Sequence, residues 1–146
     1  MTIWRLHVNT SGGNCADICL DNNVMAVGWS ITDRHIENFT EARKKKICEQ
    51  RVNINSYEDY EKLIKKWKVY DGKSYVPATV RKLYWEVKPD DLVWIRYKGI
   101  YYLGRVGDTS QWVYKINQDN LQKDQDNLQK DAAIQRTDIE WLEVGD

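Results

Sequence analysis

Two stretches near the start of the chain have apolar patterns typical of β-strands. Residues 3–8 alternate in the order Ile-Trp-Arg-Leu-His-Val, which is the period of a strand with one buried face. Residues 24–30 form a continuous apolar run, which indicates a buried strand that ends at Trp29. Ser30 then begins a loop. Between the two strands, residues 17–20 predict a short helix.

The middle of the chain has the spacing and capping residues of three helices. Residues 40–50 are predicted to form a strongly basic helix. Its consecutive basic residues are Arg43, Lys44, Lys45 and Lys46. A second helix begins after Asn55 or Ser56, either of which can cap it. Its apolar face consists of Tyr57, Tyr60, Leu63, Ile64 and Trp67. Pro77 marks the start of a third helix.

The strongest local signal is a β-hairpin. Residues 92–97 and 100–106 are joined by Lys98-Gly99, a two-residue turn of the kind that connects antiparallel strands. Period two places one set of side chains on the face that we assign to the core: Val93, Ile95, Ile100 and Tyr102. The opposite face has Trp94, Arg96, Tyr101 and Arg105. Residues 112–116 and 139–144 are predicted as two further strands.

A polar repeat precedes the last strand. Residues 118–124 read QDNLQKD, and residues 125–131 repeat this sequence without change. We therefore expect a duplicated polar segment over about residues 117–136 that forms a surface loop or a short exposed helix. The pattern as a whole fits one α+β domain that covers residues 1–146.

Composition adds an excess of aromatic residues and an uneven charge distribution. Seven Trp and nine Tyr occur with one Phe, and we expect most of these rings in the core. Residues 1–116 hold 19 Lys and Arg against 14 Asp and Glu, whereas residues 117–146 hold 3 against 8. A basic body is compatible with nucleic-acid binding on one face. No apolar stretch is long enough for a membrane span and no signal-peptide pattern is present, so we expect a cytoplasmic protein without a membrane partner.

No set of residues predicts catalysis, a metal site or a cofactor. Cys15, Cys19 and Cys48, with two scattered histidines, do not supply four spaced zinc ligands and are expected as reduced thiols. Phosphate-binding glycine loops and zinc-hydrolase patterns are missing from the sequence. A small metal-dependent nuclease that uses Glu86 or Asp91 stays open as an alternative, although Asp91 lies in a segment typical of a turn.

An aromatic binding surface has more support. Trp29 closes the buried strand beside Ser30, and Trp94 and Tyr101 share the hairpin face that is directed away from the core. Two arginines lie on that face. Aromatic rings with basic neighbours are suited to stacking on bases and contacting phosphates, at about 1–3 kcal/mol per stacked base. The alternative is that a helix covers this face, so that its rings form a second small core.

The first 35 residues resemble the PUA-like superfamily, in particular its EVE and YTH branches. In that superfamily a first strand delivers small polar residues, here Asn9 and Thr10. A short helix follows, and then a strand that ends in Trp-Ser, here Val27-Gly28-Trp29-Ser30.

Residues 88–116 extend the resemblance. The segment Lys88-Pro89-Asp90-Asp91-Leu92-Val93-Trp94 is similar to a "KxGD-hydrophobic-W/Y" strand of the superfamily, with Asp90 in place of the usual glycine. The run from Tyr101 to Val106, followed by Trp112 and Tyr114, is similar to a domain found at the start of prokaryotic modification-dependent restriction systems.

The resemblance implies a PUA-like, partly closed β-barrel flanked by helices, with an aromatic cage that accepts a flipped, modified base. Trp29 would form one wall of the cage. Hydrogen bonds to the edges of the base would come from Ser30, Asn9 and Thr10. The second wall is left open among Trp94, Tyr101 and Trp112. The candidate phosphate contacts are Lys44, Lys45, Lys46, Arg96 and Arg105.

The sequence thus predicts a reader of modified nucleic acid, with DNA favoured over RNA, that serves as the specificity module of a prokaryotic defence system. A nuclease or NTPase subunit on another chain would be its partner, and no cofactor is expected. The alternative from a different class is a protein-interaction or scaffold domain without nucleic-acid binding, which the acidic C-terminal segment and the exposed helix faces would suit.

Overall fold

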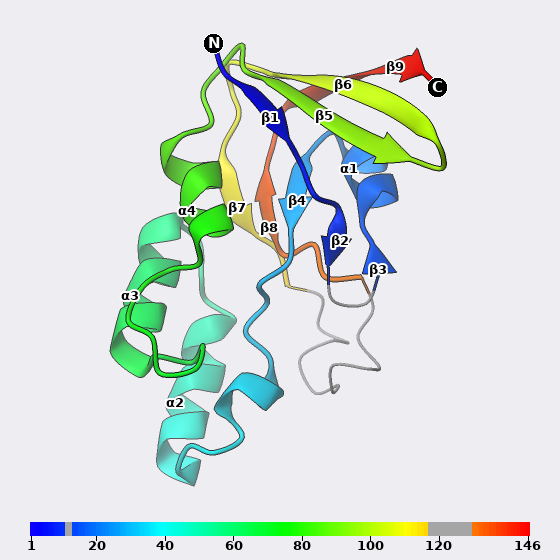
Figure 1. Ribbon diagram of the computed structural model, residues 1–146. Coiled ribbons are helices and arrows are strands. Elements are labelled where there is room, and N and C mark those ends of the chain that lie inside the picture. Colours follow the sequence, from blue (N-terminus) through cyan, green and yellow to red (C-terminus); the bar gives the residue numbers. More distant parts are fainter. Residues whose placement is uncertain (11–12, 117–129) are drawn as a thin grey trace.

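The computed structural model describes residues 1–10, 13–116 and 130–146, which form a mixed α+β fold (Figure 1). Its largest sheet has the strand order β1-β5-β6-β9. These strands are β1 (Ile3–Arg5), β5 (Leu92–Tyr97), β6 (Ile100–Val106) and β9 (Ile139–Gly145). β1 runs parallel to β5, and the other neighbours are antiparallel. The α+β class predicted from the sequence is confirmed.

A second sheet has β8 as its central strand. Its antiparallel order is β4-β8-β7, formed by β4 (Met25–Val27), β8 (Ile134–Arg136) and β7 (Trp112–Tyr114). A short ladder pairs β2 (Asn9–Thr10) with β3 (Gly13–Asn14). The strands of the described residues therefore form three separate sheets, and no closed barrel is present among them.

Three helices stand along one side of the three-stranded sheet, and α1 (Ala16–Asn22) lies under the four-stranded sheet (Figure 1). The three are α2 (Glu41–Arg51), α3 (Tyr57–Trp67) and α4 (Ala78–Trp85). Thr40 and Ser56 cap α2 and α3 by accepting hydrogen bonds from backbone N–H groups of the first turn, and Pro77 directly precedes α4. The predicted helices are thus confirmed with shifts of one or two residues at their ends.

Most aromatic rings pack in the core. Tyr57 stacks on Tyr84 with ring centroids 4.2 Å apart, and the edge of Trp112 packs against Tyr57 and Tyr60 at 5.5 and 5.8 Å. Because Trp112 is buried in this cluster, its ring is a core side chain. The exposed rings of the described residues are Trp29, Tyr75, Trp85 and Tyr101.

The predicted hairpin is present with the predicted faces. Lys98 and Gly99 both have positive φ, 51° and 78°, which is the conformation of the tight turn that matches the twist of paired strands. Val93 is buried on the core side. On the opposite face Trp94 is half-buried, and Tyr101 is exposed.

Asp91 is a structural residue that fastens β1 to β5. Its carboxylate accepts hydrogen bonds from the backbone N–H of Thr2, the indole Nε1 of Trp4 and the backbone N–H of Lys88. Burial alone would raise the pKa of this carboxyl, but the three donors lower it below its ordinary value. These three hydrogen bonds tie the N-terminal strand and the preceding turn to the start of β5, so Asp91 has a structural role.

Several predicted boundaries differ from the structure, and the strand predicted over residues 112–116 ends at Tyr114. β1 ends at Arg5, and β4 ends at Val27, because Trp29 has a positive φ of 66° that no extended strand tolerates. The polar loop expected over about residues 117–136 does not extend to residue 136, because Ile134–Arg136 is a buried central strand. Residues 117–129, which hold most of the repeat, lie outside the described residues.

Candidate functional site

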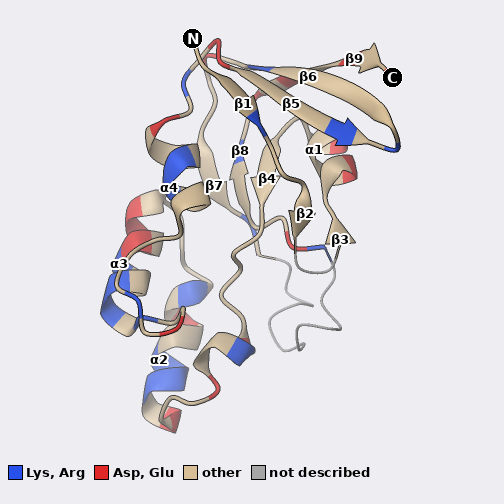
Figure 2. Cartoon of the chain, in the orientation of Figure 1, with Lys and Arg blue, Asp and Glu red and all other residues tan. Residues whose placement is uncertain are grey.

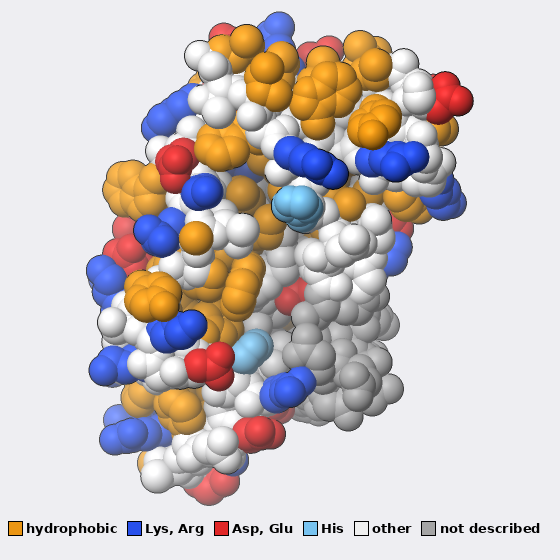
Figure 3. Space-filling model, in the orientation of Figure 1, with side chains coloured by type: hydrophobic (Ala, Val, Ile, Leu, Met, Phe, Trp, Pro, Cys, Tyr) orange, Lys and Arg blue, Asp and Glu red, His pale blue; other side chains and the backbone are white. Residues whose placement is uncertain are grey.

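A pocket of about 400 Å³ opens where β2, the end of β4 and η1 (Asp33–Ile36) meet. Figure 3 shows it as a hollow in the face between the helices and the four-stranded sheet, with histidine side chains on opposite sides of it. Its lining combines one large ring with many polar side chains. The residues that line it are His7, Asn9, Thr10, Val27, Gly28, Trp29, Ser30, Thr32, Arg34, His35, Thr79 and Asp131.

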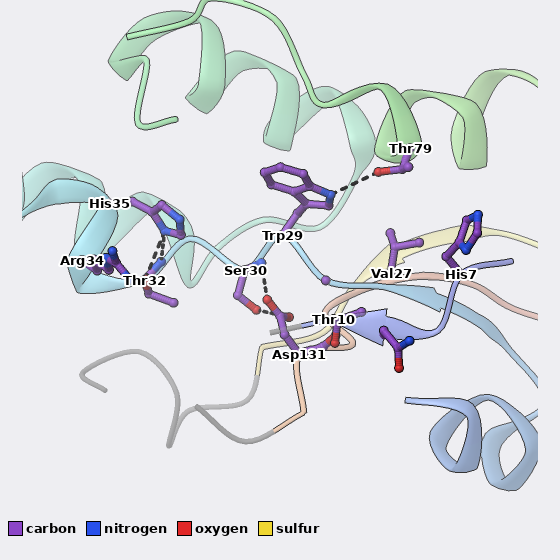
Figure 4. A pocket seen from close by; sticks show the side chains of 12 residues that line it. His7, Thr10, Val27, Trp29, Ser30, Thr32, Arg34, His35, Thr79 and Asp131 are labelled. Atoms are coloured by element: carbon purple, nitrogen blue, oxygen red, sulfur yellow. Dashed lines mark hydrogen bonds between the residues drawn. The ribbon is translucent and has the colours of Figure 1, made fainter. Parts of the chain in front are cut away.

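Trp29 forms the aromatic wall of the pocket. Trp29 is 42% exposed, and its indole Nε1 donates a hydrogen bond to Oγ1 of Thr79 at 3.1 Å, which holds the ring toward α4 (Figure 4). Tyr70 meets the ring edge-on, with centroids 5.4 Å apart. A half-exposed indole fixed by one hydrogen bond and one ring contact presents a flat surface for stacking.

Side chains from distant elements hold the backbone of Trp29 in its left-handed conformation. The hydroxyls of Tyr60 and Tyr70 lie 3.0 and 2.7 Å from the carbonyl oxygen of Trp29, and 2.9 Å from each other. Burial holds the pKa of both hydroxyls well above the ordinary value, so both stay protonated and able to donate. Since three short contacts share two protons, two hydrogen bonds form at a time.

Asp131 forms the floor of the pocket below Trp29. Its Oδ1 accepts a hydrogen bond from Oγ of Ser30 at 2.7 Å, and its Oδ2 accepts one from the backbone N–H of Ser30 at 3.1 Å. Oδ1 also accepts from the N–H of Ala133 at 3.3 Å. Gly28 allows this approach, because a methyl group there would lie 3.2 Å from Oδ2 of Asp131. In Figure 4 Asp131 and Trp29 lie on opposite sides of the Gly28–Ser30 backbone.

The next residue along the chain is held in the same way. The N–H of Ile31 donates to the hydroxyl of Tyr114 at 3.1 Å, and the Ile31 carbonyl accepts from Arg51 at 3.4 Å. Arg51 is itself buried and pairs with Asp33 at 2.7 Å. Four backbone groups of residues 29–31 are therefore paired with side chains from other elements, which fixes the Trp29 wall.

His35 completes one end of the pocket in a defined protonation state. Its Nδ1 accepts hydrogen bonds from the backbone N–H and the Oγ1 of Thr32, at 3.0 and 3.1 Å, in a capping box on η1. Burial lowers the pKa of His35, so the neutral ring is favoured. Because Nδ1 is the acceptor, the ring proton is on Nε2, which leaves Nε2–H as a donor.

The floor of the pocket is rich in hydrogen-bond acceptors. Ser30 donates its hydroxyl proton to Asp131, and Thr10 donates its own to the Asp131 carbonyl at 2.7 Å. The Ser30 hydroxyl oxygen and the Asp131 carboxylate can therefore only accept from a ligand. A flat ring with N–H groups on its edge matches a stacking wall above such a floor.

The structure brings some of the predicted site residues together and separates others. Trp29, Ser30, Asn9 and Thr10 all line the pocket. The side chains that line a neighbouring groove include Trp94, Tyr101 and Arg96. Trp112 lies in the core and lines neither, because β7 turns this side chain toward α3 and its ring packs on Tyr57 and Tyr60.

The remaining predicted phosphate contacts line neither cavity. Lys44, Lys45 and Lys46 lie on α2, at the opposite end of the molecule from the four-stranded sheet (Figure 2). Lys44 pairs with Glu41 at 3.4 Å. Arg105 pairs with Asp90 at 3.5 Å on the outer face of the sheet.

Several pocket residues were not predicted from the sequence. They are His7, Thr32, Arg34, His35, Thr79 and Asp131. The sequence around Thr32 carries a weak signal, because a hydroxyl residue three positions before a side-chain acceptor is the pattern of a capping box. Asp131 has no local signal, since it closes a polar repeat whose composition indicates a loop.

No family model, curated protein or solved structure matches the chain. Within residues 1–10, 13–116 and 130–146, no helix combines the length and apolar character needed to cross a membrane. In the same residues no three His, Cys, Asp or Glu side chains are grouped so that they could hold a metal ion.

Proposed function

We propose that this protein binds nucleic acid by accepting one flipped, modified base in the Trp29 pocket. The observation that carries the proposal is the half-exposed indole of Trp29, held in a left-handed turn above the acceptor floor of Asp131 and Ser30. A pocket of about 400 Å³ lies in the range of small-ligand sites. A base stacks on a ring and offers polar edges, so it suits both surfaces.

The chemistry of the floor narrows the class of base. Acceptors at Asp131 and Ser30 favour a base with an exocyclic amino group, as adenine and cytosine have. Flipping a base out of a duplex costs a few kcal/mol, and one stack returns about 1–3 kcal/mol. Hydrogen bonds between the amino group and the floor would offset the part of the flipping cost that stacking does not.

The resemblance to PUA-like domains also supports the proposal. In the motif that begins at Lys88, one residue differs from the superfamily pattern, but its backbone conformation fits that pattern. Asp90 stands where those proteins have glycine, and it adopts a φ of 70°, the left-handed conformation that glycine favours. The following Asp91 ties β1 to β5. A PUA-like arrangement of the strands, DNA as the preferred ligand and a role as the specificity module of a defence system, with a nuclease or NTPase partner, are parts of the same proposal.

A titration of labelled oligonucleotides tests this function. The probes are single strands and duplexes of one sequence that contain N6-methyladenine, 5-methylcytosine or the unmodified bases at the central position. The wild type should bind at least one modified probe about tenfold more tightly than its unmodified counterpart, and Trp29→Ala should remove that difference. Trp85→Ala, which alters another exposed indole outside the pocket, is the matched control. Equal affinity for all probes in both the wild type and Trp29→Ala would refute the proposal.

A protein-interaction domain is the second candidate, and one observation favours it. Ile3, Leu142 and Val144 are all more than half exposed on the four-stranded sheet. Exposed apolar side chains on one sheet mark protein-binding surfaces in many proteins. Binding of a protein partner that Leu142→Asp abolishes, without any salt-dependent nucleic-acid binding, would favour this candidate.

A further inference from the structure

A groove of about 610 Å³ runs beside the Trp29 pocket along the outer face of the four-stranded sheet. β1 and the chain that follows it form one wall, and β9 contributes Val144 and Gly145 to the other. His7 and Asn9 line both the groove and the pocket, so the two cavities are neighbours across a single short segment.

The floor of the groove has an aromatic pair with a cation beside it. Trp94 and Tyr101 meet edge to face, with ring centroids 6.5 Å apart and planes at 84°. The guanidinium of Arg96 lies 5.4 Å from the centroid of the Tyr101 ring. Tyr101 is 44% exposed, so its ring retains free surface beside this cation.

The groove also has two cationic side chains. Arg5 and Arg96 both line it and are both exposed. Neither forms an ion pair with a carboxylate within the part of the chain that the structure describes. Asp146 is the acidic residue among those that line the groove. An anionic ligand with an aromatic ring matches these side chains better than an apolar peptide does.

Cross-strand pairing explains why these residues gather on one face. Arg5 pairs with Trp94 across β1 and β5, and Arg96 pairs with Tyr101 across β5 and β6. Directly paired residues point to the same side of a sheet, so the two arginines and the two rings share the outer face. These two of the sheet's three strand pairings therefore create both the stacking surface and the charge beside it.

We propose that this groove binds the nucleotide next to the one in the Trp29 pocket, with its base on Tyr101 and Trp94 and its phosphate at Arg96 and Arg5. The inference rests on the proposed function, which places a base of the same strand in the Trp29 pocket. His7 and Asn9 line both cavities, so neighbouring nucleotides of one strand could occupy the two. The ligand would thus be a strand with two neighbouring bases unstacked, and single strands should bind more tightly than duplexes.

The test compares short and long probes on matched variants. The probes are a modified nucleoside monophosphate, which fits the pocket alone, and a single-stranded pentanucleotide with that nucleotide at its centre. Tyr101→Ala and Arg96→Gln should each weaken pentanucleotide binding about tenfold, whether or not the central base is modified, and change monophosphate binding less than twofold. Arg96→Gln should also reduce the slope of log affinity against log salt by about 0.7.

Two control variants remove groups of the same kinds, an arginine charge and an exposed aromatic ring, at positions outside the groove. Arg105→Gln removes a charge on the same sheet face, and Tyr75→Ala removes another exposed ring, yet neither residue lines the groove. Both should bind the pentanucleotide as the wild type does. If Tyr101→Ala and Arg96→Gln bind it equally well too, the groove inference is wrong.

The two proposals fail in different ways. Loss of pentanucleotide binding in the groove variants, with no effect of Trp29→Ala on selectivity, would keep the groove as a nucleic-acid site and refute the base reader. An effect of Trp29→Ala on selectivity, without any effect of the groove variants on pentanucleotide binding, would keep the base reader and refute the groove site. If no oligonucleotide binds to the wild type, both are wrong.

Discussion

The carboxylate of Asp131 accepts hydrogen bonds from both the hydroxyl and the backbone N–H of Ser30, a residue 101 positions earlier in the chain. The pair is buried and lies directly beneath Trp29. This contact connects the strand end that presents the indole to the segment that leads into β8, so the pocket depends on residues from both ends of the sequence.

Removal of the Asp131 carboxylate should destabilise the fold. Asp131→Ala leaves the Ser30 N–H and the Ala133 N–H without their acceptor, and we expect a loss of about 2–3 kcal/mol in the free energy of unfolding. Asp17→Asn, which removes the charge of a more exposed carboxylate paired with Lys130, should cost less than about 1 kcal/mol. Urea denaturation measures both, and equal losses would contradict the structural role of Asp131.

The left-handed backbone at Trp29 predicts an unusual order of stabilities. Trp29→Gly should be more stable than Trp29→Ala by about 1 kcal/mol, because glycine carries no Cβ penalty at a φ of 66°. At Lys45, an exposed position inside α2, the order should be reversed by a similar amount, since glycine is the poorer helix residue. Thermal or urea unfolding of the four variants checks this, and the same order at both sites would show that the turn is not left-handed.

The two tyrosine hydroxyls at the Trp29 carbonyl should be partly redundant. Tyr60→Phe and Tyr70→Phe each leave one donor for this carbonyl, so each should cost about 1 kcal/mol. The double variant leaves the carbonyl without a partner, and its cost should exceed the sum of the single costs by about 1 kcal/mol. A double-mutant cycle in urea measures the excess, and simple additivity would show that the hydroxyls do not share this acceptor.

Protonation of His35 should weaken the fold on the acid side of neutrality. Its pKa is lowered by burial in the folded protein and returns to about 6.5 on unfolding, so the unfolded chain binds the proton more readily. Stability should therefore be full above pH 6.5 and fall as the pH drops through that value.

His35→Gln provides the matched variant for this pH dependence. Glutamine at this position can still accept the hydrogen bond from the Thr32 N–H, as in an ordinary capping box, but does not titrate. Unfolding free energies measured between pH 7.5 and 5 should decline less steeply in His35→Gln than in the wild type. Parallel curves would exclude His35 as the source of the decline.

The elements set by local pattern could be predicted from the sequence. The hairpin is determined by alternation and by Lys98-Gly99, and α2 and α3 by Thr40 and Ser56. These signals involve residues that are close in the chain, so tertiary packing did not override them.

The parts that depend on distant contacts could not be predicted. Nothing near Trp29 in the sequence indicates its positive φ, because the side chains that hold that turn come from α3, the loop after it, and Asp131. For the same reason, the sequence does not decide whether Trp112 forms the second wall of the cage or lies in the core. A strand of three residues alternates too briefly to show which face is buried, and the packing of α3 decides it.

The most direct test of the account is the indole region of a two-dimensional ¹H–¹⁵N NMR spectrum, where each of the seven tryptophans gives one Nε1–H signal. Trp29→Phe assigns the signal of Trp29, and a pentanucleotide with a central modified base is then titrated in. If a base stacks in the pocket, the Trp29 signal should move most, and those of Trp112 and Trp85 should stay in place. An oligonucleotide that binds while the Trp29 signal does not move would contradict the account.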